Sequence, residues 1–257
     1  MIVEVVGYEH DILAVNKPVG MDTIQNAGWI TGLPRLIDVV YAAYPQARFL
    51  NRIDRDTSGI VLFGLTKAAR SHLSHLWFGA ADGRRKKLYL AVIEDPPWDD
   101  IVCDMPLKNA HGGGEDARSD FRVLERAGGR AIVEGELVSH GRTHQLRRHL
   151  KMIGYPIQGD KKYGGKRTIL RDGQLLHSWK MELPAEDGTP LVFQSKVPGD
   201  MGFRVPGGTV RRRLHVTPLT PDQQQQQKED AKCKLPTMLR PDGMAWEEYM
   251  ALRRAKV

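Results

Sequence analysis

Cysteines and long hydrophobic runs are both scarce in this sequence, and each absence excludes a class of protein. The 257 residues include two cysteines, Cys103 and Cys233, too few for a disulfide framework or a cysteine-based zinc cluster. No apolar run approaches the roughly 20 residues that a membrane-spanning helix requires. Residues 1–6 lack the basic region and cleavage site of a secretory signal. We therefore expect no membrane association and a cytoplasmic location, or an organellar one if a targeting segment has been removed.

An excess of acidic charge is also absent, and the balance is instead basic. Lysine and arginine total 38 residues against 31 acids, which gives a formal net charge of +7 and a sequence pI of about 9.4. Hydrophobic residues make up 41% and charged residues 27% of the chain, the composition of an ordinary globular protein. A basic chain of this size favours a polyanionic partner, most often a nucleic acid.

The stretch from 48 to 64 holds a dense cluster of charge and the clearest strand in the chain. Two arginines and two acids fall within residues 52–56, and an apolar run follows at 59–65. The run predicts a buried strand, and Gly59 predicts a tight turn with positive φ in front of it. A carboxylate flanked by arginines, such as that of Asp54, is favoured in its ionised form, which suits a nucleophile or base. A surface cluster of salt bridges is the alternative, and this stretch alone favours it.

Hydrophobic periodicity predicts a chain of mixed helices and strands. Apolar patterns predict strands at 3–6, 12–15, 88–93, 101–105, 121–124, 131–138, 175–183 and 191–195. Helical spacing predicts helices at 33–44, at 67–78 with Thr66 as the N-cap, and from a Thr143 cap to Gly154. In this last helix Leu146, Leu150 and Ile153 are expected to face the core, while Arg147 and Lys151 share a flank.

The C-terminal part of the chain differs in composition from the rest. A basic run at 211–213 and five glutamines at 223–227 are typical of a flexible polar extension. A short helix is predicted around 246–255. We expect residues 1–204 to form the main folded domain and residues 205–257 to add nucleic-acid contacts or to bind a partner.

Four stretches, in order, resemble the motifs of the RluA-type pseudouridine synthases. Residues 16–20, Asn-Lys-Pro-Val-Gly, match the first motif, and residues 51–59, which include Arg-Ile-Asp, resemble the Arg-Leu-Asp signature. Residues 87–91 resemble the Lys-x-Tyr strand, and residues 141–160 resemble the third motif. Four motifs in the family's order are far more specific than one. The resemblance covers roughly the first 200 residues, and a Leu-Leu-His pattern at 175–177 also fits it.

The resemblance implies an enzyme that isomerises uridine to pseudouridine in RNA, with no cofactor. In this family the uracil is detached from its ribose, turned and rejoined through carbon. Asp54 matches the catalytic aspartate, Arg147 the arginine that pairs with it, and Tyr89 the tyrosine that stacks near the base and is a candidate for proton transfer. The sequence leaves open whether the aspartate attacks the sugar or removes a sugar proton to give a glycal.

Three further residues are implied to bind the substrate. Leu146 matches an apolar residue at the base pocket. Arg52 matches an arginine that fills the space left by a flipped nucleotide, with a structural role as the alternative. Lys17 is expected to contact phosphate or to be structural. His144 and His149 are expected to pack or hydrogen-bond rather than to act in catalysis, and their spacing makes a poor metal site.

Two positions depart from the family pattern. Asn51 stands where the family often has His, and this difference bears on fine positioning more than on activity. Ile53 replaces the common Leu, a change that conserves volume.

Together these observations predict an α+β protein with the pseudouridine synthase catalytic fold. We expect a bent, mostly antiparallel mixed sheet with flanking helices and a central cleft. The predicted protein is a monomeric enzyme acting on tRNA or rRNA, with tRNA slightly favoured because no added RNA-binding domain is apparent. The runner-up is a non-catalytic RNA-binding or ribosome-assembly factor that keeps the fold. A generic phosphate-binding enzyme is disfavoured because the chain has no glycine-rich phosphate loop.

Overall fold

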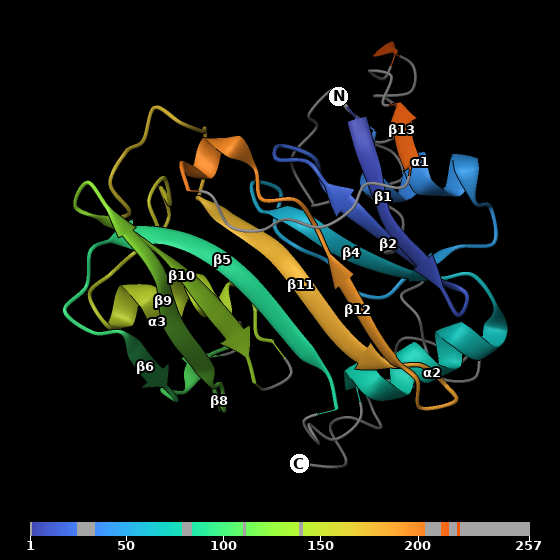
Figure 1. Ribbon diagram of the computed structural model, residues 1–257, viewed down its shortest axis with the longest axis horizontal. Helices are drawn as coiled ribbons and strands as arrows, with labels where there is room; N and C mark the ends of the chain where they lie inside the picture. The colour runs from blue at the N-terminus through green and yellow to red at the C-terminus, as the bar shows by residue number, and fades with distance from the viewer. Residues whose placement is uncertain are drawn as a thin grey trace.

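One large sheet organises the molecule (Figure 1). The computed structural model describes residues 2–24, 34–78, 84–109, 112–138, 141–203, 212–215 and 220–221. The strands are β1 (Ile2–Glu9), β2 (Ile12–Lys17), β3 (Arg48–Phe49), β4 (Ser58–Gly64), β5 (Lys86–Glu94), β6 (Asp100–Cys103), β7 (Leu107–Lys108), β8 (Gly114–Glu115), β9 (Ser119–Ala127), β10 (Arg130–Leu137), β11 (Leu176–Pro184), β12 (Pro190–Gln194) and β13 (Arg212–His215). The helices are α1 (Leu36–Ala43), α2 (Lys67–Phe78), α3 (Gln145–Met152) and the short 3-10 helix η1 (Gly199–Met201).

The sheet is mixed and mostly antiparallel, as predicted. Its strand order is β13-β1-β2-β4-β11-β5-β10-β9-β6, with β12 paired to β11 and β3 paired to β4. β4 and β11 run parallel, with Ser58 opposite His177, while the other pairs in the sheet are antiparallel. β7 and β8 form a separate two-stranded ribbon. Figure 1 shows β5 and β11 curving through the middle, with α3 beside β9 and β10 and with α1 and α2 beside the other half.

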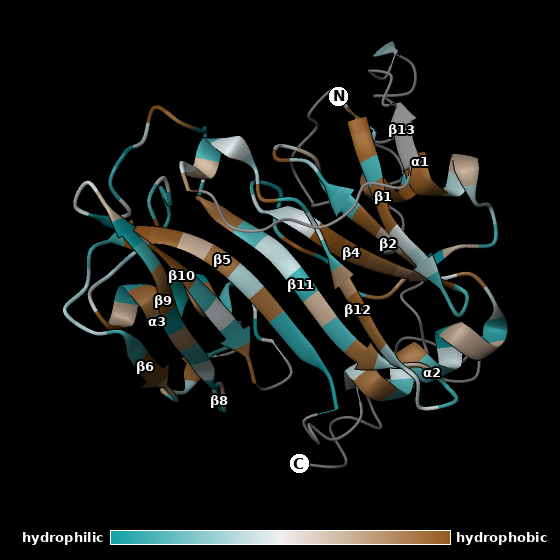
Figure 2. Ribbon diagram, viewed as in Figure 1, coloured by the Kyte–Doolittle hydropathy of each residue, from teal (hydrophilic) through white to brown (hydrophobic). Residues whose placement is uncertain are grey.

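β4 is buried along its whole length because both faces of the sheet are covered at this point. Val61 and Phe63 belong to a core that includes residues of α1 and α3. Ile60 and Leu62 belong to a second core that includes the apolar residues of α2. A strand that is covered on both faces is apolar at successive positions rather than at alternate ones, and Figure 2 shows hydrophobic colour along β4. The predicted buried strand is therefore confirmed.

The helix boundaries agree with the sequence prediction for α2 and differ for α3. Ala69 N–H donates to the Thr66 hydroxyl at 3.2 Å, so Thr66 caps α2 as predicted. The prediction of Thr143 as the cap of α3 was wrong, because His144 occupies the N-cap position in a left-handed conformation and makes no side-chain cap bond. In this turn the side chain of Gln145 makes the hydrogen bond: its Oε1 accepts the Arg142 N–H at 2.8 Å.

Part of the C-terminal extension joins the sheet. β13 pairs antiparallel with β1, with Ile2 opposite His215. The predicted glutamine linker at 223–227 and the predicted helix at 246–255 lie outside the described residues, so the role of the extension stays a prediction. Within the described residues, none of the helices has the length and hydrophobicity required to cross a membrane.

Candidate active site

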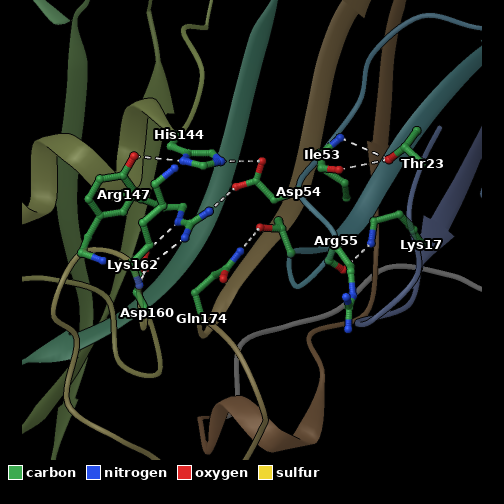
Figure 3. A network of polar contacts seen from close by, with 12 residues as sticks. Lys17, Thr23, Ile53, Asp54, Arg55, His144, Arg147, Asp160, Lys162 and Gln174 are labelled. Carbon is green, nitrogen blue, oxygen red and sulfur yellow. Dashed lines mark hydrogen bonds and ion pairs between the residues drawn. The ribbon is translucent and has the colours of Figure 1, made fainter. Parts of the chain in front are cut away.

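Asp54 lies in the loop between β3 and β4, and hydrogen bonds anchor this loop on both sides of it (Figure 3). The carbonyl of Asp54 accepts the Thr57 N–H at 3.0 Å, which closes a turn before β4. The Thr23 hydroxyl donates to the carbonyl of Ile53 at 3.1 Å and accepts its N–H at 3.4 Å. The Thr57 hydroxyl accepts the side-chain amide of Gln174 at 3.0 Å. The backbone at Asp54 is therefore held in place, although its side chain is 32% exposed.

Arg147 of α3 bridges two carboxylates, those of Asp54 and Asp160. Its Nη1 donates to Asp54 Oδ2 at 2.7 Å, while Nε and Nη2 donate to the two oxygens of Asp160 at 2.6 and 2.9 Å. Asp160 is fully buried and also accepts the N–H groups of Lys162 and Tyr163, both at 3.1 Å. Burial opposes the charge of Arg147, but the bonds to Asp160 and the charges of both aspartates raise its pKa above the ordinary value. Arg147 is a fixed positive charge beside Asp54.

The cation that pairs with Asp54 is distant in sequence. The charge pattern predicted that Arg52 and Arg55 would flank the carboxylate. In the structure Arg55 Nε lies 3.7 Å from Asp56, and Arg52 is exposed where it lines the pocket. The ion pair with Arg147 is the contact that the family resemblance implied.

His144 approaches the other oxygen of Asp54, as Figure 3 shows. Its Nε2 lies 3.5 Å from Asp54 Oδ1, and its Nδ1 lies 2.9 Å from the Tyr163 hydroxyl. Burial lowers the pKa of His144, with help from the positive charges of Arg147 and Lys162 and against the charge of Asp54. The imidazole is therefore neutral at pH 7.

A pocket opens beside Asp54, and the candidate residues Tyr89 and Leu146 lie in its wall together with Trp77 and Lys87. Burial, with a smaller contribution from the charge of Asp54, raises the pKa of Tyr89 to about 12, so its phenol keeps its proton at neutral pH. Lys87 Nζ stacks over the Trp77 ring at 5.3 Å. Burial lowers the pKa of Lys87 to about 7, and the charge of Arg85 acts in the same direction. The pocket thus combines a carboxylate, a protonated phenol, an aromatic face and the basic side chains of Arg52, Lys87, Arg142 and Arg147.

Lys17 is the one candidate that the structure does not bring into this pocket. Its side chain is fully buried, and Nζ donates to the carbonyls of Pro18, Met21 and Arg55 at 2.9, 2.6 and 2.9 Å. The bond to Arg55 fixes the loop directly after Asp54 (Figure 3). This geometry corresponds to the structural alternative for Lys17 rather than to a phosphate contact.

Asn51 and His149 also help to hold the site together. Asn51 Oδ1 accepts the Leu62 N–H at 2.8 Å, so the residue that departs from the family pattern ties the loop to β4. His149 is fully buried, with Nδ1 3.0 Å from the Ser119 hydroxyl and Nε2 3.0 Å from the Met105 carbonyl. The prediction that His149 packs and hydrogen-bonds is confirmed.

Sequence reasoning missed the contacts of Asp160 and Tyr163. Asp160 belongs to the motif stretch 141–160, but nothing in its spacing indicates a bond to Arg147. The prediction that His144 hydrogen-bonds is confirmed by its contact with the Tyr163 hydroxyl, whereas its approach to Asp54 was missed. Among the described residues, no group of three or more His, Cys, Asp and Glu side chains is arranged to hold a metal ion.

The family model described as RNA pseudouridylate synthase matches residues 11–152, which include Asp54, Tyr89 and Arg147. The chain belongs to the RNA pseudouridine synthases of the RluA family. The match covers more than half of the chain.

Curated relatives agree with this assignment. The chain is 32% identical over 213 residues to the uncharacterized RNA pseudouridine synthase YlyB of Bacillus subtilis, covering 75% of this chain and 68% of YlyB. It is 36% identical over 174 residues to ribosomal large subunit pseudouridine synthase C of Vibrio cholerae, covering 62% of this chain and 53% of that relative. It is 28% identical over 222 residues to ribosomal large subunit pseudouridine synthase D of Nitrosomonas europaea, covering 76% of this chain and 62% of that relative. The chain thus spans little more than half to two thirds of the length of these relatives.

Two solved human structures share the fold. RNA Pseudouridylate Synthase Domain Containing 4 superposes with a TM-score of 0.64 at 19% identity, covering 79% of this chain and 95% of that one. RNA Pseudouridylate Synthase Domain Containing 1 superposes with a TM-score of 0.61 at 19% identity, covering 91% of this chain and 97% of that one. The predicted pseudouridine synthase fold is confirmed.

Proposed function

We propose that this protein isomerises uridine to pseudouridine in RNA and that Asp54 carries the reaction. The bond between N1 of the uracil and C1′ of the ribose breaks, and a bond between C5 and C1′ forms. C5 loses its hydrogen and N1 gains one, so the product is an isomer of the substrate. The observation that supports this most strongly is the carboxylate of Asp54, which lines the pocket while Arg147 holds its Oδ2 at 2.7 Å.

The other pocket residues have complementary roles in this proposal. Arg147 stabilises and orients the carboxylate through a charge-assisted hydrogen bond. Tyr89, which stays protonated at neutral pH because burial raises its pKa to about 12, stacks near the detached uracil and can donate a hydrogen bond to it. Leu146 supplies apolar contact to the base, and Arg52 occupies the space that the flipped nucleotide leaves in the RNA. Asp54 either attacks C1′ or removes the proton at C2′, and both routes need this same arrangement.

The substrate we propose is a specific uridine in structured RNA. Two of the relatives described above are named for the large ribosomal subunit, which supports rRNA, and tRNA is the other candidate. A net charge of +7 suits either polyanion.

Mapping pseudouridines across cellular RNA tests the proposal and identifies the substrate together. The comparison uses a deletion strain complemented with wild type or with Asp54→Asn. Sites that are lost in the deletion, restored by wild type and not restored by Asp54→Asn would support catalysis by Asp54. If Asp54→Asn restored every site, the assignment of Asp54 would be wrong. If no site depended on the gene but RNA maturation did, the protein would act as a non-catalytic RNA-binding factor.

A further inference from the structure

Arg147 alone does not fix the Asp54 carboxylate. Three nitrogens of its guanidinium are used, but two of them bind Asp160, and only Nη1 reaches Asp54 Oδ2. A single hydrogen bond leaves the carboxylate free to turn about the Cβ–Cγ bond. Catalytic groups need their geometry held within a fraction of an ångström and about 10–20°. A second contact, to Oδ1, would complete the restraint.

His144 is the group that stands at Oδ1. Its Nε2 lies 3.5 Å from that oxygen, a separation that a small movement can close when substrate binds. The backbone of His144 has φ 55° and ψ 30°, a left-handed conformation that is uncommon for a residue other than glycine. Such conformations persist where the surrounding structure enforces them, and they cluster at functional sites. Here the conformation turns the imidazole from the start of α3 toward Asp54.

Tyr163 favours one tautomer of His144. Burial raises the pKa of Tyr163, so its hydroxyl keeps its proton, and it lies 2.9 Å from Nδ1, to which it can donate. A neutral imidazole that accepts at Nδ1 must carry its hydrogen on Nε2. That hydrogen faces Asp54 Oδ1, which can only accept.

Tyr163 is itself fixed by the Arg147–Asp160 pair. Its N–H donates to Asp160 Oδ1 at 3.1 Å, and its ring lies 5.1 Å from the guanidinium of Arg147. Its ring also meets that of His144 edge to face, with centroids 5.7 Å apart. The contacts therefore form a closed ring that runs through Asp54, His144, Tyr163, Asp160 and Arg147 (Figure 3).

We propose that His144 is a positioning residue, whose tautomer is set by Tyr163 and which holds Oδ1 of Asp54 while Arg147 holds Oδ2. This inference rests on the proposed function of Asp54. It also gives a reason for the neutral state of the imidazole. A protonated His144 would place a second full positive charge on the carboxylate and weaken it as a base or nucleophile. It would also present an N–H to the Tyr163 hydroxyl, which would have to rotate away.

The first test substitutes His144→Asn, because asparagine tolerates the left-handed conformation but its side chain does not reach Oδ1 in the same way. We expect the single-turnover rate constant on substrate RNA to fall by about tenfold to a hundredfold, as for a small misplacement of a catalytic group, with Kd for the RNA unchanged. His75→Asn, on the exposed part of α2, is the matched control and should keep the wild-type rate. An unchanged rate in His144→Asn, or a loss confined to Kd, would overturn the inference.

The second test uses the pH profile, which a merely packing role would not move. The charged groups that face His144 are Asp54, Asp160, Arg147 and Lys162, and Tyr163→Phe leaves all of them in place. Loss of the phenol O–H removes a bond that favours the neutral imidazole, so the pKa of His144 rises. The acidic limb of the rate profile should therefore move to higher pH in Tyr163→Phe. A limb at the same pH in wild type and Tyr163→Phe would contradict the role of Tyr163. Asp54→Asn separates the two proposals, because its full activity would refute the proposed function, whereas full activity of His144→Asn alone would refute this inference.

Discussion

The guanidinium of Arg147 lies 2.7 Å from the carboxylate of Asp54 across 93 residues of sequence. The contact joins the loop before β4 to helix α3, so it depends on the correct packing of both halves of the sheet. Asp160 restrains this contact, because it is fully buried and accepts hydrogen bonds from Nε and Nη2 of Arg147. Stability and activity are therefore linked at this point.

Asp160→Asn should reduce both stability and activity. The substitution leaves the buried Arg147 with one carboxylate instead of two, and loss of one partner from a buried ion pair costs about 3–5 kcal/mol. Urea unfolding should show this loss, and single-turnover kinetics should show a slower reaction at unchanged Kd. Asp172→Asn is the control, because Asp172 pairs with Lys161 on the surface and should leave the midpoint unchanged. Equal midpoints for the two variants would contradict the role of Asp160.

Lys17→Met should destabilise the fold through the loop that carries Asp54. The change removes three hydrogen bonds and leaves the carbonyls of Pro18, Met21 and Arg55 without this donor, at a cost of about 2–4 kcal/mol. Chemical denaturation measures the effect. A variant as stable as wild type would show that the loop is held without Lys17.

The stability of wild type relative to Lys17→Met should also depend on pH. Burial lowers the pKa of Lys17 to about 7, although the charges of Asp22, Asp56 and Asp54 oppose the shift, whereas an unfolded lysine has a pKa of about 10.4. Between these values the unfolded state binds more protons, so the free energy of unfolding rises with pH. The difference between wild type and Lys17→Met should therefore grow from pH 7 to about pH 10. A difference independent of pH across this window would show that Lys17 stays charged in the fold.

Gly59→Ala should be far more damaging than an alanine at an open glycine. Gly59 has φ +113°, and an added Cβ would lie 2.2 Å from the Ser178 carbonyl oxygen on β11. We expect a loss of about 3 kcal/mol from this overpacking. Gly128, with φ +57° and open space around it, is the control and should lose about 1 kcal/mol from backbone strain alone. Similar losses at the two sites in thermal unfolding would count against the close packing of β4 on β11.

Under the proposed role of Arg52, Arg52→Ala should slow the reaction because alanine is too short to fill the space left by the flipped nucleotide. Flipping costs a few kcal/mol, so loss of a part of that compensation predicts a rate lower by about tenfold. Arg122→Ala is the control, since Arg122 is exposed on β9 and pairs with Glu134. If both variants reacted at the wild-type rate, Arg52 would be structural or solvated.

The sequence was sufficient for features that depend on local patterns. The limits of α2 followed from Thr66 and helical spacing, and β4 followed from its continuous apolar residues. The motif resemblance placed Asp54, Tyr89, Leu146 and Arg147 around one site, and the structure brings all four into one pocket.

Contacts between distant segments were beyond local sequence patterns. The charges next to Asp54 placed Arg52 and Arg55 beside the carboxylate, whereas only the motif resemblance implied the pairing with Arg147 that the structure shows. The left-handed turn at His144 was missed because the residue pattern indicates a Thr143 cap, and the contacts that His144 makes with Tyr163 and Asp54 are tertiary. The two-residue strands β7 and β8 are too short for a periodic pattern to indicate them.

The most direct test of the account measures hydrogen loss from C5 of uridine. Purified wild type and Asp54→Asn are incubated with RNA from the deletion strain that carries tritium at C5 of uridine, and filter binding measures RNA affinity in parallel. Wild type should release tritium as pseudouridine forms, while Asp54→Asn should release none and bind RNA with unchanged affinity. Release of tritium by Asp54→Asn at the wild-type rate would contradict the central claim that Asp54 carries the reaction.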